Sequence, residues 1–556
     1  VMEYSESLNK FLRKYPHIKT HVEALVGQVR STSRHAGGVV IGEDLDKYMP
    51  LICSGGVVQT PWSEGMNVRH LEPLGFIKFD ILGLSTLEMI QSAVGHVLKR
   101  HHNIENPTFN DIKKYYDDNL HPDKIDLNDQ KVYKNIFHKG KFVGIFQFTN
   151  AGAQRLARKV KPKDIIDISA ITSIYRPGPL SAGVDKSYVK AKKEQNATYL
   201  NDIVKETAGF MIFQEQIALL AHKLGKNVTL EEGNKLRKLL TKKGTGKGAE
   251  EKEDIRRRFV EGCIDKNIES EAAAALWRNF EYFSGYGFNK SHAVAYSILS
   301  FQCAWLLNYY PDCWTAAFLD KEPESRKEAA ISLAQKHGFR IENININTST
   351  AQWEIADDGK TLVQPFSSIK GLGNKAVDQI ISNRPFNTVE ELLFNAKGTA
   401  PSKLNKKTLD ALCRSGALDN LVDDRFNGCK HFWMSCVQDR PKNVKKLEEK
   451  IKEHCQEQDF SIEEKIEHVS SLTGIFPFDL VMTKAIRESI KKYVVPPIGS
   501  WDKDLGIAWF IPREVIPKLT KNGKPYWIVK VIDDSDYSED WGFSTRSITH
   551  TFKLLG

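Results

Sequence analysis

The spacing of hydrophobic residues divides the chain into segments of different predicted structure. Hydrophobic positions three and four apart predict helices over about the first thirty residues. Short hydrophobic runs mixed with glycine, at residues 37–41 and 75–84, are typical of strands. From about residue 86 to residue 320 the helical spacing returns. Strand-like segments set apart from one long helical region predict an α+β fold, and the length of the chain predicts that it is multidomain.

Polar and glycine-rich breaks indicate where the helical region is divided. They fall at residues 176–179, 244–248 and 285–287, and a polar segment at residues 320–324 is predicted to be a linker at a domain boundary. Beyond it, the charged residues 442–452 predict an exposed helix. The C-terminal end is predicted to contain strands at residues 507–510 and 526–532.

Composition narrows the class of protein. The 556 residues exceed what one core usually serves, and 41% are hydrophobic and 27% charged, as in ordinary globular proteins. The sequence contains no hydrophobic run near the ~20 residues of a membrane span. The eight cysteines form no C-x-x-C pair, which argues against a zinc ribbon and favours reduced thiols and a cytoplasmic location. The net charge of +9 is mild, so a polyanionic partner is indicated only where basic residues cluster.

A lysine and an aspartate alternate with hydrophobic residues at residues 77–81. Strand geometry places Lys78 and Asp80 on one face and Ile77, Phe79 and Ile81 on the other, which suits a core. A carboxylate beside a lysine can hold a divalent cation and meet phosphate charge in phosphoryl transfer. An ordinary ion pair at a strand end explains the same pattern and is the better interpretation of the pattern alone.

A glycine turn at residues 285–287 precedes a hydrophobic helix predicted to run to about Tyr310. Ser291 is predicted to cap that helix, and Asn289, Lys290 and His292 crowd the same end. Because helix N-termini bind anions, a nucleotide is a candidate ligand there. An ordinary capped helix explains the motif equally well.

Basic residues gather beside a hydrophobic stripe near residue 237. Arg237, Lys238, Lys242 and Lys243 lie off the stripe, and they suit either a triphosphate and DNA backbone or a solvated helix face. Residues 175–179 predict a rigid turn that displays an arginine, Arg176.

The segment at residues 369–376 has the glycine spacing of a helix-hairpin-helix. A helix, a tight turn and a second helix are predicted, with the turn amides contacting nucleic-acid phosphates without reading sequence. The residues of this predicted DNA-binding turn are Lys370, Gly371, Gly373 and Lys375. Residues 409–418 are predicted to be its structural companion.

Taken in order, these motifs resemble one family, the C family of bacterial replicative DNA polymerases, which comprises the alpha subunits of DNA polymerase III. The matching segments are residues 35–41, 78–84, 146–147, 176–179, 214–216 and 285–292, followed by the helix-hairpin-helix. The resemblance implies the end of a thumb at residues 1–33, the C-terminal half of a nucleotidyltransferase-like palm at 34–92 and helical fingers at 93–330. It also implies a clamp-binding domain at 331–485 and the start of an OB-fold, cut short, at 486–556. A hairpin turn at residues 521–524 would lead to the barrel strand at 526–532, which fits the turn chemistry.

The resemblance implies roles for individual residues. Asp80 corresponds to one of three aspartates that bind Mg²⁺, with Lys78 as its phosphate-facing neighbour. Arg237 corresponds to the first of two arginines that contact the incoming triphosphate, and Lys238 replaces the second, which loses the bidentate fork. The remaining residues of the implied nucleotide pocket are Tyr286, Asn289, Ser291 and His292. Arg176, Lys242 and Lys243 are expected to contact DNA.

The family's other two catalytic aspartates lie on a palm strand that precedes the thumb, in an Asp-x-Asp pattern. This sequence contains neither that palm strand nor the family's PHP domain. We therefore expect this chain to synthesise DNA from dNTPs on primer-template DNA only with an N-terminal portion or a split-gene partner. The alternative is a catalytically inactive DNA-binding scaffold. A sliding clamp is a further expected partner, through residues 456–460, although Asp459 stands where a hydrophobic anchor is expected.

Overall fold

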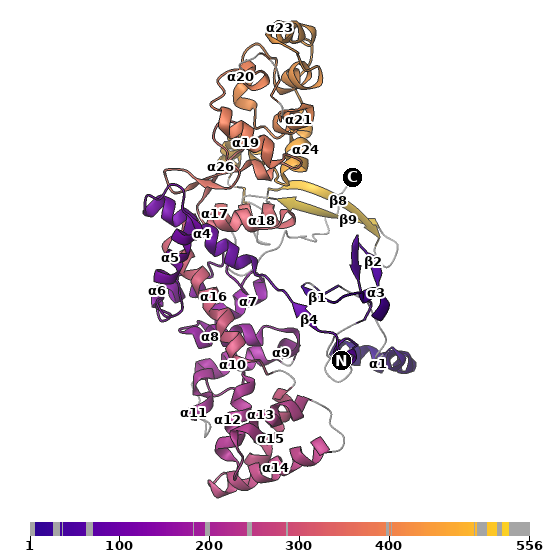
Figure 1. Cartoon of the computed structure of the whole chain (residues 1–556), viewed down its shortest axis with the longest axis vertical. Helices are drawn as coiled ribbons and strands as arrows, with labels where there is room; N and C mark the ends of the chain where they lie inside the picture. Colours follow the sequence, from indigo (N-terminus) through magenta and orange to yellow (C-terminus); the bar gives the residue numbers. More distant parts are fainter. Residues whose placement is uncertain are drawn as a thin grey trace. The chain divides into compact units, whose positions relative to one another are not determined.

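The computed structural model contains two units, residues 1–88 and 89–556, which are described separately (Figure 1). The residues that the structure describes are 6–25, 34–35, 37–62, 70–181, 183–194, 201–241, 247–284, 287–395, 398, 400–401, 403–493, 495–496, 509–519 and 525–532.

The first unit begins with helices and continues into short strands. Helices α1 (Glu6–Lys14) and α2 (Lys19–Ala24) confirm the predicted helical start. The remaining elements are β1 (Gly38–Val40), α3 (Leu45–Tyr48), β2 (Ile52–Ser54), β3 (Val57–Gln59) and β4 (Lys78–Asp80). Strands β1 and β4 pair antiparallel with Gly38 opposite Asp80, and β2 and β3 form a separate antiparallel pair. Both segments predicted as strands therefore contain a strand, and they pair with each other.

The hydrophobic face of β4 is exposed, so the prediction that it faces a core is wrong. Ile77, Phe79 and Ile81 are 66%, 47% and 70% exposed, and Val39, which pairs with Phe79, is 43% exposed. Alternation along the strand separates the two faces as predicted, but burial also needs a second layer. The described residues of this unit form only a two-stranded sheet at this point.

The second unit is mostly helical up to residue 336, which confirms the helical region predicted to about residue 320 and extends it. Its helices are α4 (Ser85–His101), α5 (Phe109–Asn119), α6 (Gln130–Val132), α7 (Ala151–Val160), α8 (Ile165–Ile174), α9 (Pro177–Ser181), α10 (Val184–Glu194), α11 (Asn201–Val204), α12 (Gln214–Leu224), α13 (Leu230–Thr241), α14 (Lys247–Asp265), α15 (Ser270–Ser284), α16 (Lys290–Tyr309), α17 (Pro311–Lys321) and α18 (Glu324–Lys336). Helix α16 is hydrophobic around most of its circumference and packs on α8, with Ser169 Oγ and Ser297 Oγ 3.0 Å apart in the interface. Burial on several sides explains its uniform composition.

Helices α12 to α15 form one packed group. Phe259, Trp277 and Phe280 are buried together, with ring centroids 5.1–5.9 Å apart. Helices α12 and α13 cross closely at Gly233, where an added Cβ would lie 2.6 Å from the carbonyl oxygen of Ala218. The absence of a side chain at this position permits the crossing.

Residues 320–324 are mostly helical, which corrects the predicted linker: only Glu322 and Pro323 connect α17 and α18, and the domain boundary stays a prediction. Helix α17 ends at Lys321 and α18 begins at Glu324. The Asp320 side chain is buried and accepts a hydrogen bond of 2.9 Å from the backbone N–H of Trp353. Polar composition suggested exposure, but the carboxylate instead joins α17 to the following module.

That module combines a small sheet with short helices. Strands β5 (Arg340–Glu342), β6 (Glu354–Ile355) and β7 (Thr361–Val363) form a sheet in the order β5–β7–β6. The helices are α19 (Asn374–Asn383), α20 (Val389–Leu393), α21 (Lys406–Arg414), α22 (Cys429–Phe432), α23 (Val444–Glu453), α24 (Ile462–Thr473), α25 (Phe478–Val481) and α26 (Lys484–Tyr493). One core contains both Val377 and Ile380 of α19 and Leu409 and Leu412 of α21, as expected for a motif and its companion. Helix α23 confirms the helix predicted at 442–452.

The C-terminal strands are β8 (Ile511–Leu519) and β9 (Pro525–Ile532), paired antiparallel. The strand predicted at 526–532 is confirmed, whereas the one predicted at 507–510 begins at residue 511. The turn predicted at 521–524 lies outside the described residues, and the OB-fold stays a prediction. All eight cysteines are free thiols. Within the described part of the chain, the helices are too short or too polar to span a membrane.

The buried Asp320 generates a prediction about stability. Burial raises the pKa of Asp320 to about 6, above its ordinary value of 3.8. The folded state therefore retains this proton after the unfolded chain has lost it, so the stabilisation is complete below about pH 4 and is lost as the pH rises through about 6. We expect Asp320→Asn to raise stability by roughly 2–3 kcal/mol at pH 7.5 and to have much less effect at pH 4. Thermal unfolding at both pH values measures this difference; an equal effect at the two would show that Asp320 titrates normally.

Candidate functional site

Strand β4 presents Lys78 and Asp80 on one face, as predicted. Lys78 Nζ lies 3.2 Å from Asp80 Oδ1, and His35 Nε2 lies 3.9 Å from the same oxygen. Gly37 makes this arrangement possible, because a Cβ there would lie 2.2 Å from the carbonyl oxygen of Ile81. The backbone N–H of Ile81 donates to the Gly37 carbonyl at 2.8 Å. Asp80 therefore has two cationic or potentially cationic neighbours on one exposed face.

The described residues around Asp80 do not by themselves fit a magnesium centre. Mg²⁺ takes six oxygen ligands, and catalytic pairs of ions need several carboxylates. Asp80 belongs to none of the described groups of three or more ligand side chains. Two such groups occur elsewhere, but Arg100 lies 3.3 Å from Asp312 in one, and Lys450 lies 3.2 Å from Asp439 in the other. These carboxylates already have cationic partners.

The N-terminus of α16 is capped by Asn289, not by Ser291 as predicted. Asn289 Oδ1 accepts a hydrogen bond of 2.8 Å from the backbone N–H of His292 and one of 2.6 Å from Ser291 Oγ. Asn289 has extended backbone angles and is the last residue before the helix, the position at which a side-chain acceptor meets the free amides. Tyr310 terminates the helix, close to the predicted end.

Glu215 gathers several candidate groups at this helix end. Its Oε1 accepts a hydrogen bond of 2.9 Å from Asn289 Nδ2, and its Oε2 accepts one of 2.9 Å from the backbone N–H of Lys290. Arg237 Nη1 of α13 lies 3.5 Å from Oε1. The structure thus brings Arg237 and Asn289, which the sequence singled out separately, to one carboxylate whose role the sequence did not indicate.

A backbone bridge fixes the two segments that carry these residues. The backbone N–H of Gln214 donates to Phe288 at 2.9 Å, and that of Phe288 donates to Ile212 at 3.2 Å. The Gln214 side chain also donates to the carbonyl of Gly287 at 3.0 Å. The start of α12 and the start of α16 are therefore held at a fixed separation.

Two further cations belong to the same cluster. Lys290 Nζ contacts both carboxylate oxygens of Glu206, at 2.6 and 2.8 Å. Arg176 is half-buried with its guanidinium 4.5 Å from the centroid of the Phe288 ring, so it is not displayed on the surface as predicted. Its Nε donates to the carbonyl of Ser173 at 2.8 Å, and burial lowers the pKa of its guanidinium. Phe288, whose backbone is held by the bridge to residues 212–214, therefore packs against the Arg176 guanidinium.

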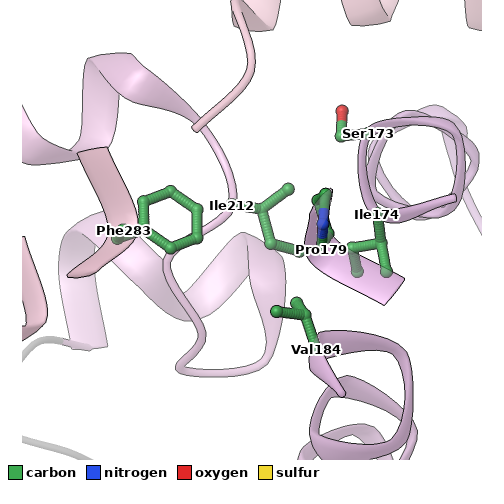
Figure 2. Close-up of a pocket in the computed structure, with 6 residues that line it drawn as sticks. All are labelled: Ser173, Ile174, Pro179, Val184, Ile212 and Phe283. Carbon is green, nitrogen blue, oxygen red and sulfur yellow. The ribbon is translucent and has the colours of Figure 1, made fainter. Parts of the chain in front are cut away.

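A small hollow lies among α8, α9, α10, α15 and the segment before α12. Figure 2 shows its lining, which consists of Ser173, Ile174, Pro179, Val184, Ile212 and Phe283. The lining is almost entirely hydrophobic, and the Ser173 hydroxyl donates to the carbonyl of Ser169. A phosphate group does not fit such surroundings.

Several predicted site residues are not tested by the geometry. Tyr286, Lys242 and Lys243 lie outside the described residues, and so does the side chain of Lys238. Ser291 and His292 are exposed at the start of α16, and the His292 ring lies 4.1 Å from the Tyr296 ring. Their roles stay predictions.

The predicted DNA-binding turn has the expected glycine geometry. Gly371 adopts φ +83°, a left-handed conformation that favours glycine, and Gly373 precedes α19. The element before the turn is a single 3-10 turn, Phe366–Ser368, so the first of the two predicted helices is wrong. Lys370 and Lys375 are exposed on either side.

The candidate clamp-binding segment packs against its own domain. Asp459 pairs with Lys465 at 2.5 Å and accepts a hydrogen bond from the backbone N–H of Lys430 at 3.1 Å. The Phe460 ring lies 5.8 Å from Trp433 and 4.8 Å from His468. The carboxylate that interrupts the expected hydrophobic anchor therefore has a local structural role.

Comparison with known families assigns most of these regions. Residues 1–83 match the bacterial DNA polymerase III alpha NTPase domain, and residues 87–267 match the bacterial DNA polymerase III alpha subunit finger domain. Residues 338–427 match a helix-hairpin-helix motif. The matches follow the order that the sequence motifs indicated.

Curated relatives agree with the family models. DNA polymerase III subunit alpha of Aquifex aeolicus is 32% identical over 416 residues, which are 73% of this chain and 34% of that protein. The subunit of Campylobacter jejuni is 30% identical over 75% of this chain and 34% of its own length. The subunit of Pseudomonas aeruginosa is 30% identical over 81% of this chain and 38% of its own length. The chain spans about a third of the length of these relatives, and it belongs to the C family of bacterial replicative DNA polymerases, the DNA polymerase III alpha subunits.

The close crossing of α12 and α13 generates a prediction, because these helices carry Glu215 and Arg237. We expect Gly233→Ala to destabilise the protein by about 1–3 kcal/mol, since the new methyl group meets backbone atoms that cannot move aside. Gly95→Ala in α4 is the matched control. Its Cβ would meet only Ile112 Cδ1, at 3.9 Å, and alanine favours helix. Equal midpoints of thermal unfolding for the two variants would contradict this account of the crossing.

Proposed function

We propose that this chain is part of a DNA-directed DNA polymerase that transfers nucleotides from dNTPs to a primer 3′-hydroxyl under the direction of a template. The observation that carries the proposal is the convergence of Arg237, Asn289 and the first amide of α16 on one carboxylate. Converging guanidinium and amide donors at a helix N-terminus suit a triphosphate. The names of the relatives support the same reaction.

In this proposal Arg237 contacts the triphosphate, and Asn289, Ser291 and His292 line the nucleotide pocket together with Tyr286 and Lys238. Arg237 is 23% exposed at its side chain, so it is accessible to a ligand. Asp80 is a metal ligand, and Lys78 offsets the negative charge of the Asp80 carboxylate in the absence of the ion and the phosphates. Divalent ions, Mg²⁺ in the first instance, would activate the primer hydroxyl and stabilise the charge on the transferred phosphoryl group.

The proposal includes carboxylates supplied by polypeptide outside these 556 residues. Two observations support it. Asp80 is the single described carboxylate beside Lys78, whereas a metal site needs several carboxylates. The hydrophobic face of β4 is exposed and lacks a covering layer among the described residues. The same Lys78–Asp80 pair favours the alternative, a DNA-binding scaffold without catalysis, since the pair is complete without a metal. Sliding-clamp binding through residues 456–460 and a cytoplasmic location stay predictions.

Primer extension separates these alternatives. We expect no synthesis by the chain alone with Mg²⁺ and four dNTPs, and synthesis when a polypeptide with an Asp-x-Asp palm strand is added. Asp80→Asn, which keeps the shape but removes the charge, should reduce that synthesis at least about a hundredfold. Asp44→Asn is the control, because Asp44 is an exposed residue of the same unit whose partner is Lys47. DNA binding without synthesis in the mixture would favour the scaffold, and synthesis by the chain alone would refute the need for outside carboxylates.

The helix-hairpin-helix generates a prediction about DNA binding. We propose that Lys370 and Lys375 contact phosphates beside the turn amides. Replacing both by glutamine should weaken duplex binding and reduce the slope of log K against log salt by about 1.8, or about 0.9 for each lost phosphate contact. The exposed lysines Lys445 and Lys452 of α23 provide a double control of equal charge. Equal slopes for the two double variants would place the phosphate contacts elsewhere.

A further inference from the structure

We infer that Glu215 is a positioning residue of the nucleotide site, which holds Arg237 in register with the N-terminus of α16. The inference rests on the proposed function and adds a residue to it. Three contacts carry it: the hydrogen bonds from Asn289 Nδ2 and from the backbone N–H of Lys290, both 2.9 Å, and the ion pair with Arg237 at 3.5 Å.

The position of Glu215 is fixed by its own backbone. It lies in the first turn of α12, one residue after Gln214, whose backbone and side chain both bond to the segment before α16. Gln216 secures the same turn from the other side, since its Oε1 accepts hydrogen bonds from the backbone N–H groups of Ile212 and Phe213 at 2.8 and 3.0 Å. The Glu215 carboxylate is therefore presented from a rigid base to elements α13 and α16.

The contacts of Glu215 differ in length, as expected for a residue that is fixed to one helix and directs a side chain of another. Both short hydrogen bonds join it to the N-terminal end of α16. The Arg237 contact is longer and uses one nitrogen of a guanidinium that has five N–H donors. Arg237 follows Leu236, which is fully buried, so its backbone is anchored while its long side chain depends on an external partner for direction. The carboxylate directs that side chain without occupying all of its donors.

The second cation at this helix end has a different partner. Lys290 Nζ is held by both oxygens of Glu206, a complete ion pair. The two acidic residues thus have distinct roles: Glu206 satisfies Lys290, while Glu215 links Arg237 to the backbone of α16. Loss of Glu215 would leave Arg237 uncoupled from the helix end and would leave Asn289 Nδ2 without this acceptor.

Binding of a fluorescent dNTP to the full 556-residue chain tests the inference. We expect Glu215→Gln to weaken binding about tenfold, because the charge-assisted contact to Arg237 is lost and an amide cannot accept on both atoms. Glu215→Asp should recover part of the loss, since it keeps the charge on a shorter side chain. Glu231→Gln is the matched control, because it removes the same charge from an exposed position in the first turn of α13. Thermal unfolding identifies any variant that fails to fold.

A double-mutant cycle with Arg237→Gln separates this inference from the proposed function. If Glu215 acts through Arg237, then Glu215→Gln should have little further effect in the Arg237→Gln background, and nucleoside binding should change much less than dNTP binding. Equal dNTP affinities for Glu215→Gln and Glu231→Gln, or tighter binding by Glu215→Gln, would overturn the inference while Arg237→Gln still impairs binding. Unchanged dNTP binding by Arg237→Gln would overturn the proposed nucleotide site itself, and the inference with it.

Discussion

The backbone bridge between Phe213 and Phe288 is the constraint on which the candidate nucleotide site depends. It joins segments about 75 residues apart in the sequence, and the hydrogen bonds of Glu215 to Asn289 and Lys290 lie within a few residues of it. Neither segment can form the bridge alone, because the backbone N–H groups of Gln214 and Phe288 each donate to the other segment and not to their own helix. Once the bridge forms, Glu215 faces the first turn of α16, and Phe288 lies under the guanidinium of Arg176.

Electrostatic balance is the second feature of this site. Arg237 and Lys290 would repel each other at a helix end that already carries partial positive charge. Glu215 and Glu206 offset this repulsion in the absence of a ligand, at the cost of placing negative charge where phosphates are proposed to bind. Pairing one cation tightly and the other loosely resolves the conflict, since the loosely paired arginine retains donors for a ligand. A site built only of cations would bind anions without discrimination and would lack a defined geometry.

The sequence predicted the elements more reliably than their environments. The helical region, β4 with Lys78 and Asp80 on one face, and α16 with its polar end follow from local spacing, which the chain carries in a few neighbouring residues. Exposure of Ile77 and Phe79, burial of Asp320 and the convergence on Glu215 depend on residues distant in the sequence. No periodicity indicates that Glu215 meets Asn289, and the preference for Ser291 as the cap failed because both residues are good caps. The resemblance to a family supplied the order of the motifs, which no single motif provided.

The two faces of β4 have opposite requirements, and this opposition bears on how the proposed metal site at Asp80 would be built. A two-stranded sheet is marginally stable in water, so the β1–β4 pair gains from any layer that covers Phe79 and Val39. The opposite face must stay accessible, because a carboxylate buried beside a lysine cannot receive a metal ion or a phosphate. A covering layer on the hydrophobic face would also fix the strand twist, and with it the direction in which Asp80 points. Stabilisation of the sheet and alignment of the carboxylate would then come from the same contact, so a covering layer would contribute to the proposed reaction even through residues that never touch the substrate.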